Sequence, residues 1–438
     1  MSRNYGLAIA ALILVRFVAG AVLPLSADEA YYWLWSKHLA AGYYDHPPMI
    51  AWAIRAGTMV FGDTAFGVRA VPLLLGMGAS WCVWRVGGER ACLFFNLMLM
   101  TAVELMAATP DAPLVASAAA FLYCLTRVDE DPRWWLAVGA AGGAALLSKY
   151  TGFFLGIGAL AWIVFAARRW LLSPWPYLGA VLALAIFAPN VWWNATHHWM
   201  TFAFQFGRVS AGHFTLRFLF EFLGAQLLLA SPLILIASGV GLRRDALLAA
   251  LVLPAVVYFA VHSLHDRVQG NWPCFLYPMF AVAAAQVRLR FAAAVAAVML
   301  ALCYVQVLFD AVPLKDPGSR LLAYGMGDAV RAIEADRPAA ILTTDYATTA
   351  WLSFYGHVPV VQVNEPQRGL GGPIPKGRLV YVAESTRDRH DLLAGAKRLA
   401  PVARLRSGVE VGRYVRYGVQ NANAGSEGPE PASLTTGQ

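Results

Sequence analysis

The sequence predicts an α-helical polytopic membrane protein with about eleven transmembrane helices and a small C-terminal α/β domain outside the membrane. Three observations predict this class. The 438-residue chain is 59% hydrophobic and only 14% charged, whereas a soluble domain carries about 25% charged residues. Long apolar runs recur from residue 5 to residue 310, and ordinary globular composition follows residue 315. We therefore expect a membrane domain at 1–312, an α/β domain at 313–420 and a disordered tail at 421–438.

The expected spans each contain roughly 20 mostly apolar residues. They lie near 5–25, 66–84, 91–109, 112–127, 134–149, 151–167, 174–193, 217–240, 246–263, 272–287 and 291–310. If the N-terminus is cytoplasmic, every inner gap carries arginine, as the positive-inside tendency requires. These arginines are Arg3, Arg85, Arg90, Arg127, Arg133, Arg168, Arg169, Arg243, Arg244, Arg288 and Arg290. We therefore expect a bacterial cytoplasmic membrane protein whose C-terminal domain is periplasmic.

Charge and cysteine usage narrow the function classes further. The net charge of +8 is spread over short gaps and forms no basic stripe, so we expect no nucleic-acid partner. All five cysteines fall inside apolar runs without metal-ligand spacing. We interpret them as small buried hydrophobic residues. The spans can bury one another, so a monomer is expected.

The segments outside the spans also have a predicted structure. The first outer loop, 26–65, contains two amphipathic interfacial segments at 29–39 and 48–61, and a second aromatic-rich outer loop covers 194–216. The C-terminal domain is expected to alternate helices and strands. The helices are expected at 319–335, 347–355 and 388–399, and the strands at 339–343, 358–363 and 378–383.

Polar residues collect at the expected outer ends of the spans. They are Asp28, Glu29, Asp45, His46, Asp111, Lys149, Tyr150, Asn194, His197 and His198. Charges at a membrane edge are costly and usually have a function or a partner. A carboxylate base assists a hydroxyl acceptor in a group transfer, and a cation stabilises a leaving phosphate. Asp28 and Asp111 suit the first task and Lys149 suits the second.

Each of these residues also has a simpler interpretation. Asp28 follows a span and is interfacial in many proteins, Asp111 after a proline can cap a helix start, and Lys149 can extend toward the interface. Arg16 and Glu104 lie deeper in predicted spans, where we favour a structural ion pair.

A divalent metal site is a further hypothesis. Asp45 and His197, with His46 and His198 nearby in sequence, combine carboxylate and imidazole ligands. Such ligands suit Zn, Mn or Mg. The spacing matches no recognised motif, so ordinary hydrogen bonding is the favoured interpretation.

Four motifs stand in order along the apolar part of the chain. The first outer loop contains SADEAYY at 26–32 and YYDHPPM at 43–49. The other motifs are TPDAP at 109–113, SKYTG at 148–152 and PNVWWNATHHW at 189–199. Together they resemble the motifs of the protein O-mannosyltransferase-like family of GT-C glycosyltransferases (families 39 and 83), over residues 5–310. That family includes lipid A aminoarabinose transferases and lipopolysaccharide-core galacturonosyl transferases.

The resemblance implies an inverting transfer of a hexose or pentose from a polyprenyl-phosphate carrier, such as undecaprenyl phosphate, at the outer membrane face. It implies that Asp28 is the essential acid and that Asp111 lines the same cavity. We expect the substrates to contact Glu29, Tyr44, His46, Lys149, Tyr150, Asn194 and Arg208. Aminoarabinose transferases have a glutamate–lysine pair where this chain has Asp45 and His46, so the donor can differ.

Two other classes compete with a glycosyltransferase. A transporter or lipid flippase would also have many spans, but the sequence shows none of the repeated halves that are common in transporters. A scaffold whose outer domain binds a partner has no specific support. Within the enzyme class, the acceptor remains open between lipid A, another surface glycan and a protein hydroxyl.

Overall fold

The computed structural model describes residues 3–207, 214–393 and 395–419, and these residues form two compact units. The first unit comprises Met1–Leu23 and Trp35–Ala311, and the second comprises Pro24–Leu34 and Val312–Gln438. The short segment Pro24–Leu34 thus packs with the C-terminal part of the chain, which the sequence analysis did not anticipate. Each unit is described by itself.

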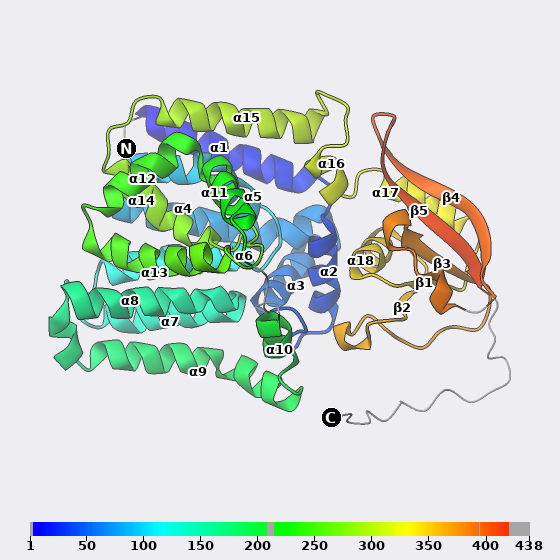
Figure 1. The fold of residues 1–438 in the computed structure, drawn as a ribbon, viewed down its shortest axis with the longest axis horizontal. Helices are drawn as coiled ribbons and strands as arrows, with labels where there is room; N and C mark the ends of the chain where they lie inside the picture. The colour runs from blue at the N-terminus through cyan, green and yellow to red at the C-terminus, as the bar shows by residue number, and fades with distance from the viewer. Residues whose placement is uncertain (1–2, 208–213, 394, 420–438) are drawn as a thin grey trace. The chain divides into compact units, whose positions relative to one another are not determined.

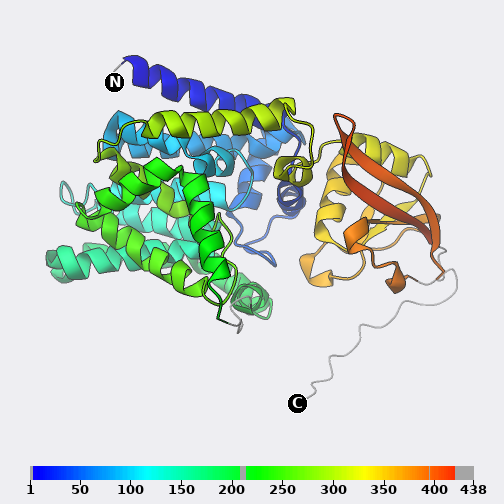
Figure 2. The same ribbon diagram turned by 45° about the horizontal axis from the view of Figure 1, so that its top comes forward.

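The first unit is a helical bundle (Figures 1 and 2). Its α-helices are α1 (Arg3–Val22), α3 (Met49–Phe61), α4 (Ala65–Leu97), α5 (Leu99–Glu104), α6 (Asp111–Leu125), α7 (Trp134–Ser148), α8 (Phe153–Ala166), α9 (Trp175–Thr196), α10 (Met200–Gly207), α11 (Arg217–Ala230), α12 (Pro232–Leu242), α13 (Ala246–His262), α14 (Tyr277–Ala285) and α15 (Ala292–Phe309). Short 3-10 turns cover η1 (Tyr150–Gly152), η2 (Arg168–Leu172) and η3 (Cys274–Leu276). The helix α2 (Ala27–Lys37) begins in the second unit's segment, and its last turn belongs to the first unit.

Four helices in the described residues are long and apolar enough to cross a membrane, namely α1, α4, α9 and α15. Most of the other expected spans coincide with apolar helices of 10–17 residues. These helices fit a polytopic membrane protein, and the number of eleven spans stays a prediction.

Two expected spans have a different shape from the prediction. The span expected at 217–240 is a pair of helices, α11 and α12, that meet at 99°. Ser231 has a positive φ of 68° there, and Pro232 has no N–H to continue the helical ladder. The break expected between 84 and 91 lies inside α4, where Gly88 has non-helical backbone angles and bends the helix.

The second unit contains a five-stranded mixed sheet in the order β2-β1-β3-β5-β4. The strands are β1 (Ala340–Thr343), β2 (Val360–Gln362), β3 (Leu379–Glu384), β4 (Lys397–Arg406) and β5 (Val409–Val419). β1 pairs in parallel with β2 and β3, and β5 pairs antiparallel with β3 and β4. The helices are α16 (Pro317–Leu321), α17 (Met326–Glu334) and α18 (Tyr346–Tyr355), with 3-10 turns η4 (Pro366–Arg368), η5 (Ser385–Arg387) and η6 (His390–Leu392).

Two predictions for this unit are wrong. In place of the helix expected at 388–399, the described residues form the 3-10 turn η6 and then enter β4 at Lys397, which forms a long hairpin with β5. Ser407 and Gly408 both have positive φ at its turn, the backbone that tight hairpins favour. The single helix expected at 319–335 is split into α16 and α17, since Leu322 bridges to Ser26 and Gly325 has a φ of 70°. The tail expected to be disordered lies outside the described residues.

Candidate active site

Asp111 and Lys149 form a buried ion pair in the first unit. Asp111 is the first residue of α6, directly after Pro110, and Lys149 follows the last residue of α7. The Lys149 Nζ lies 2.7 Å from Asp111 Oδ1, and their side chains are 11% and 3% exposed. Two residues predicted from separate motifs are therefore brought together, so the cap and interfacial interpretations do not account for them.

Two further donors hold the Asp111 carboxylate. Asn271 Nδ2 donates to Oδ2 at 2.7 Å, and Cys274 Sγ lies 3.1 Å from Oδ1. The sequence analysis missed both residues, because Cys274 resembles the other buried cysteines and Asn271 stands in no recognised motif. The only available signal is that Asn271 is polar and stands just before an apolar run. With three donors on two oxygens, the carboxylate is well suited to orienting Lys149.

Tyr150 and Asn194 belong to a second polar cluster with Asn190. The Tyr150 hydroxyl donates to Asn190 Oδ1 at 3.1 Å and accepts from Asn194 Nδ2 at 3.3 Å. Asn190 Nδ2 in turn donates to the carbonyl of Ala41 at 2.9 Å. A Cβ at Gly42 would collide with the Trp193 ring. This cluster therefore fixes the loop between α2 and α3 against α9.

The same loop is also held by α10. Thr201 Oγ1 donates to the carbonyl of Tyr43 at 2.7 Å, and Gln205 donates to the carbonyl of Asp45. The ring of Tyr44 lies 4.7 Å from that of Phe204. Burial raises the pKa of Tyr43 to about 12, so its hydroxyl stays protonated and can donate to backbone carbonyls.

No group of three metal-ligating side chains is found within residues 3–207, 214–393 and 395–419. His197 Nδ1 lies 2.8 Å from the carbonyl of Trp193, and its ring stacks on Trp193. Asp45 and His46 lie in the loop described above. His197 thus takes part in the hydrogen bonding that the sequence favours, and the metal site with Asp45 stays a hypothesis.

Asp28 and Glu29 belong to the second unit. Ser26 is the N-cap of α2, where Glu29 Oε2 accepts from the Ser26 N–H at 2.8 Å and Ser26 Oγ accepts from the Glu29 N–H at 3.2 Å. This reciprocal pair is a capping box, which gives Glu29 a structural task that the sequence analysis did not assign. Asp28 Oδ1 accepts a hydrogen bond from the Tyr346 hydroxyl at 3.0 Å.

Aromatic and cationic side chains pack around Tyr346, the hydrogen-bond partner of Asp28. The ring of Tyr346 lies 5.0 Å from that of Tyr31, and the Arg368 guanidinium stacks 4.9 Å from the Tyr346 ring. Neither Tyr346 nor Arg368 was a predicted site residue. They lie more than 300 residues from Asp28 in sequence, and no local pattern links such distant positions.

Two remaining predictions have different outcomes. Arg16 donates to Asn96 Oδ1 at 3.1 Å, and the expected pair with Glu104 is not among its described contacts. Glu104 accepts from Thr109 Oγ1 at 3.1 Å. Asn96 accepts one hydrogen bond from the buried guanidinium, and Arg16 Nε has no hydrogen-bond partner among the described residues. Arg208 lies outside the described residues.

Comparison with known proteins finds similarities in both sequence and fold. Residues 45–193 match the family model described as dolichyl-phosphate-mannose-protein mannosyltransferase. A 275-residue stretch is 29% identical to the lipid A galacturonosyltransferase RgtD of Rhizobium johnstonii, and it covers 57% of this chain and 58% of that relative. The chain thus spans a little over half the length of this relative.

Two solved structures share the fold over nearly the whole chain. ArnT from Cupriavidus metallidurans in the apo state superimposes with a TM-score of 0.67 at 17% identity, covering 94% of this chain and 97% of that one. ArnT bound to undecaprenyl phosphate gives a TM-score of 0.64 at 18% identity, covering 98% and 100%. The resemblance inferred from the four motifs is confirmed. The chain is a membrane protein that shares the fold of ArnT and is similar in sequence to RgtD over part of its length.

Proposed function

We propose that this protein transfers a sugar from a polyprenyl-monophosphate carrier to a hydroxyl or phosphate acceptor. The observation that carries the proposal is the Lys149 ammonium, held 2.7 Å from the buried Asp111 carboxylate. Lys149 has three N–H donors, and its described hydrogen bond to Asp111 uses one of them. The other two can bind phosphate oxygens in a site with little water, where charge interactions are strongest.

The proposed reaction is a single displacement at the anomeric carbon. An acceptor oxygen attacks that carbon as the bond to the phosphate oxygen breaks, so the configuration is inverted. Polyprenyl phosphate leaves with the bonding electron pair, and Lys149 stabilises the charge that develops on it. We assign Asp28 to remove the acceptor proton. Asp111, Asn271 and Cys274 act as positioning residues for Lys149.

The comparisons favour particular substrates within this class. RgtD is described as a lipid A galacturonosyltransferase, and one ArnT structure contains undecaprenyl phosphate. We therefore propose undecaprenyl phosphate as the carrier and lipid A or another lipopolysaccharide component as the acceptor. Galacturonic acid is the first sugar to test.

The test replaces the cation and follows the release of free undecaprenyl phosphate by mass spectrometry. Lys149→Met should lower kcat by roughly 100-fold or more, in line with the loss of one preorganised donor to a developing charge. Because this change leaves Asp111 buried without its partner, which costs about 3–5 kcal/mol, Lys149→Met/Asp111→Asn is measured beside it. The double variant should recover thermal stability and remain inactive.

Lys37→Met is the matched control. Lys37 is also paired with an aspartate, at 2.5 Å from Asp63, but that pair is partly exposed. The Lys37→Met variant should keep the parent activity. Normal turnover in the folded Lys149→Met/Asp111→Asn variant would refute the proposal.

A further inference from the structure

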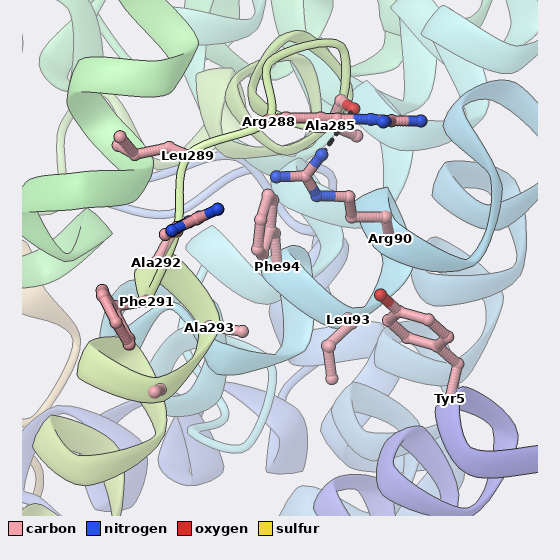
Figure 3. A pocket seen from close by; sticks show the side chains of 12 residues that line it. Tyr5, Arg90, Leu93, Phe94, Ala285, Arg288, Leu289, Phe291, Ala292 and Ala293 are labelled. Carbon is pink, nitrogen blue, oxygen red and sulfur yellow. Dashed lines mark hydrogen bonds between the residues drawn. The ribbon is translucent and has the colours of Figure 1, made fainter.

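A second polar pocket lies in the first unit and shares no residue with the candidate active site. It has a volume of about 1010 Å³ and is formed by the start of α1, the part of α4 after the Gly88 bend, and the segment from α14 to α15. Figure 3 shows the Arg90 guanidinium and the Tyr5 hydroxyl among the side chains that line it. Its size is that of a small-molecule site.

Three arginines line the pocket, and no carboxylate is among the described residues that do so. Arg90 is oriented by a 3.5 Å hydrogen bond to the carbonyl of Ala285 and by the Phe94 ring, 5.1 Å away. Arg288 and Arg290 are exposed, and neither has a salt bridge within residues 3–207, 214–393 and 395–419. Concentrated positive charge in a lining without carboxylates favours an anionic ligand.

The first turn of α15 adds donors of another kind. Ala292, Ala293 and Ala294 line the same pocket, and the first N–H groups of a helix have no partner within the helix. The N-cap residue, Phe291, provides no side-chain cap and has a φ of 64°. An L residue rarely adopts that backbone, and such residues cluster at ligand sites. The positive end of the helix dipole therefore lies beside the three arginines.

We propose that this pocket binds a phosphate group. Arginine presents a planar fork of donors that matches phosphate oxygens, and free N–H groups at a helix start bind the same group. These two features are independent and meet at one cavity. In the topology that the sequence predicts, Arg90, Arg288 and Arg290 lie at the cytoplasmic end of their helices, whereas Asp111 and Lys149 lie at the outer end.

Two sources can supply the phosphate, namely a phospholipid headgroup and a soluble phosphate ester. The exposed Phe291 ring at the rim, with 74% of its surface accessible, suits the boundary between headgroups and acyl chains. Basic pockets between membrane helices on the cytoplasmic side commonly bind anionic lipids. The experiment therefore includes both sources.

The test measures binding, so that it is independent of sugar transfer. Delipidated protein in detergent is titrated with phosphatidylglycerol, and bound lipid is counted by native mass spectrometry. A parallel arm follows thermal stability in inorganic phosphate. Arg288→Gln/Arg290→Gln should weaken binding of whichever probe the parent binds by about tenfold or more. Both arginines are exposed, so the variant should fold.

The matched control is Arg168→Gln/Arg169→Gln, a second exposed arginine pair between helices, and it should bind as the parent does. Loss of phosphatidylglycerol binding in the pocket variant alone identifies a lipid site, and loss of the phosphate response alone identifies a soluble phosphate ester. Three outcomes would overturn the proposal. They are equal binding by all three proteins, equal loss of binding in both variants, and no binding of either probe by the parent.

Discussion

The Asp111 carboxylate is almost fully buried and is surrounded by donors from distant parts of the chain. Lys149, Cys274 and Asn271 reach it from the end of α7 and from the segment around η3. A buried charge is stable only when its hydrogen-bonding capacity is used. The donors therefore fix the carboxylate, and the carboxylate in turn fixes the direction of the Lys149 ammonium.

Asn271 tests this account of positioning. Asn271→Ala removes the donor to Oδ2, and the unpaired buried oxygen should cost about 1–3 kcal/mol of stability. Because Lys149 keeps its charge but loses a fixed position, kcat should fall while KM changes little. Asn271→Asp should be worse than Asn271→Ala, since it places a second carboxylate against the first.

Thermal unfolding and steady-state kinetics of the parent, Asn271→Ala and Asn271→Asp test whether Asn271 positions the ion pair. Equal stability and equal kcat for the parent and both variants would show that Asn271 does not position the pair.

Sequence reasoning found Asp111 and Lys149 because each stands in a short motif at a predicted span end. It could not find Asn271 or Cys274 in the same way. They contact Asp111 across 160 residues and more, and their contact arises only when α6 and η3 pack together. Cys274 illustrates the problem, since a buried thiol in an apolar run looks the same whether or not it touches a carboxylate.

Among the elements, α7 and α9 pack through small residues. Gly139 and Gly143 on α7 face Gly179 and Ala183 on α9, and a Cβ at Gly139 would collide with the backbone carbonyl of Gly179. Such spacing lets helix backbones approach closely in a membrane. Since Lys149 follows the last residue of α7 and α9 carries Asn190 and Asn194, this contact also places the two polar clusters.

Gly139→Ala should therefore destabilise the protein although alanine favours helix by about 1 kcal/mol. The added methyl group forces the helices apart, at a cost of about 1–3 kcal/mol. Gly156→Ala on α8 is the control, because a Cβ there meets no atom within 4 Å. Thermal unfolding in detergent should show a lower Tm for the first variant and an unchanged or higher Tm for the second. An unchanged Tm in Gly139→Ala would contradict the close contact.

Elements with strong local signals were predicted well, and α1, α6, α7 and α9 lie close to the expected ranges. The hairpin of β4 and β5 was missed for a physical reason. Arg404 and Arg406 are buried although they are charged, because Arg404 donates to backbone carbonyls and Arg406 donates to Ser319. These two arginines alternate with Ala403 and Leu405, so the sequence marks the internal face as the polar one. Only tertiary packing makes the arginine face internal.

For the whole molecule, the arrangement of arginines carries the predicted orientation in the membrane. The predicted inner gaps all contain arginine, and the candidate active site and the phosphate pocket fall at opposite ends of the predicted spans. In this topology, the proposed sugar transfer takes place at the outer face of the membrane, and the proposed phosphate group binds at the inner face.

Cysteine labelling in intact cells tests the orientation. The native cysteines are buried except Cys303, which is partly exposed, so the background carries Cys303→Ala. A membrane-impermeant maleimide should label Arg398→Cys in the C-terminal domain without permeabilisation. Arg243→Cys, in a predicted inner gap, should react only after the membrane is opened. The reverse pattern would invert the topology.

The grouping of residues 24–34 with the C-terminal unit has a consequence for biosynthesis. This segment is translated early, whereas its partners are translated after the bundle. The Leu25 N–H donates to the Tyr355 hydroxyl, and the Leu25 carbonyl accepts from the Ala323 N–H. Trp33 packs on Phe354. The ribosome must therefore complete every predicted span before this segment can dock. A nascent chain that stops near Ala311 would carry its whole bundle and still lack the partners of Asp28 and Trp33, so the proposed catalytic acid would mature only after the bundle is complete.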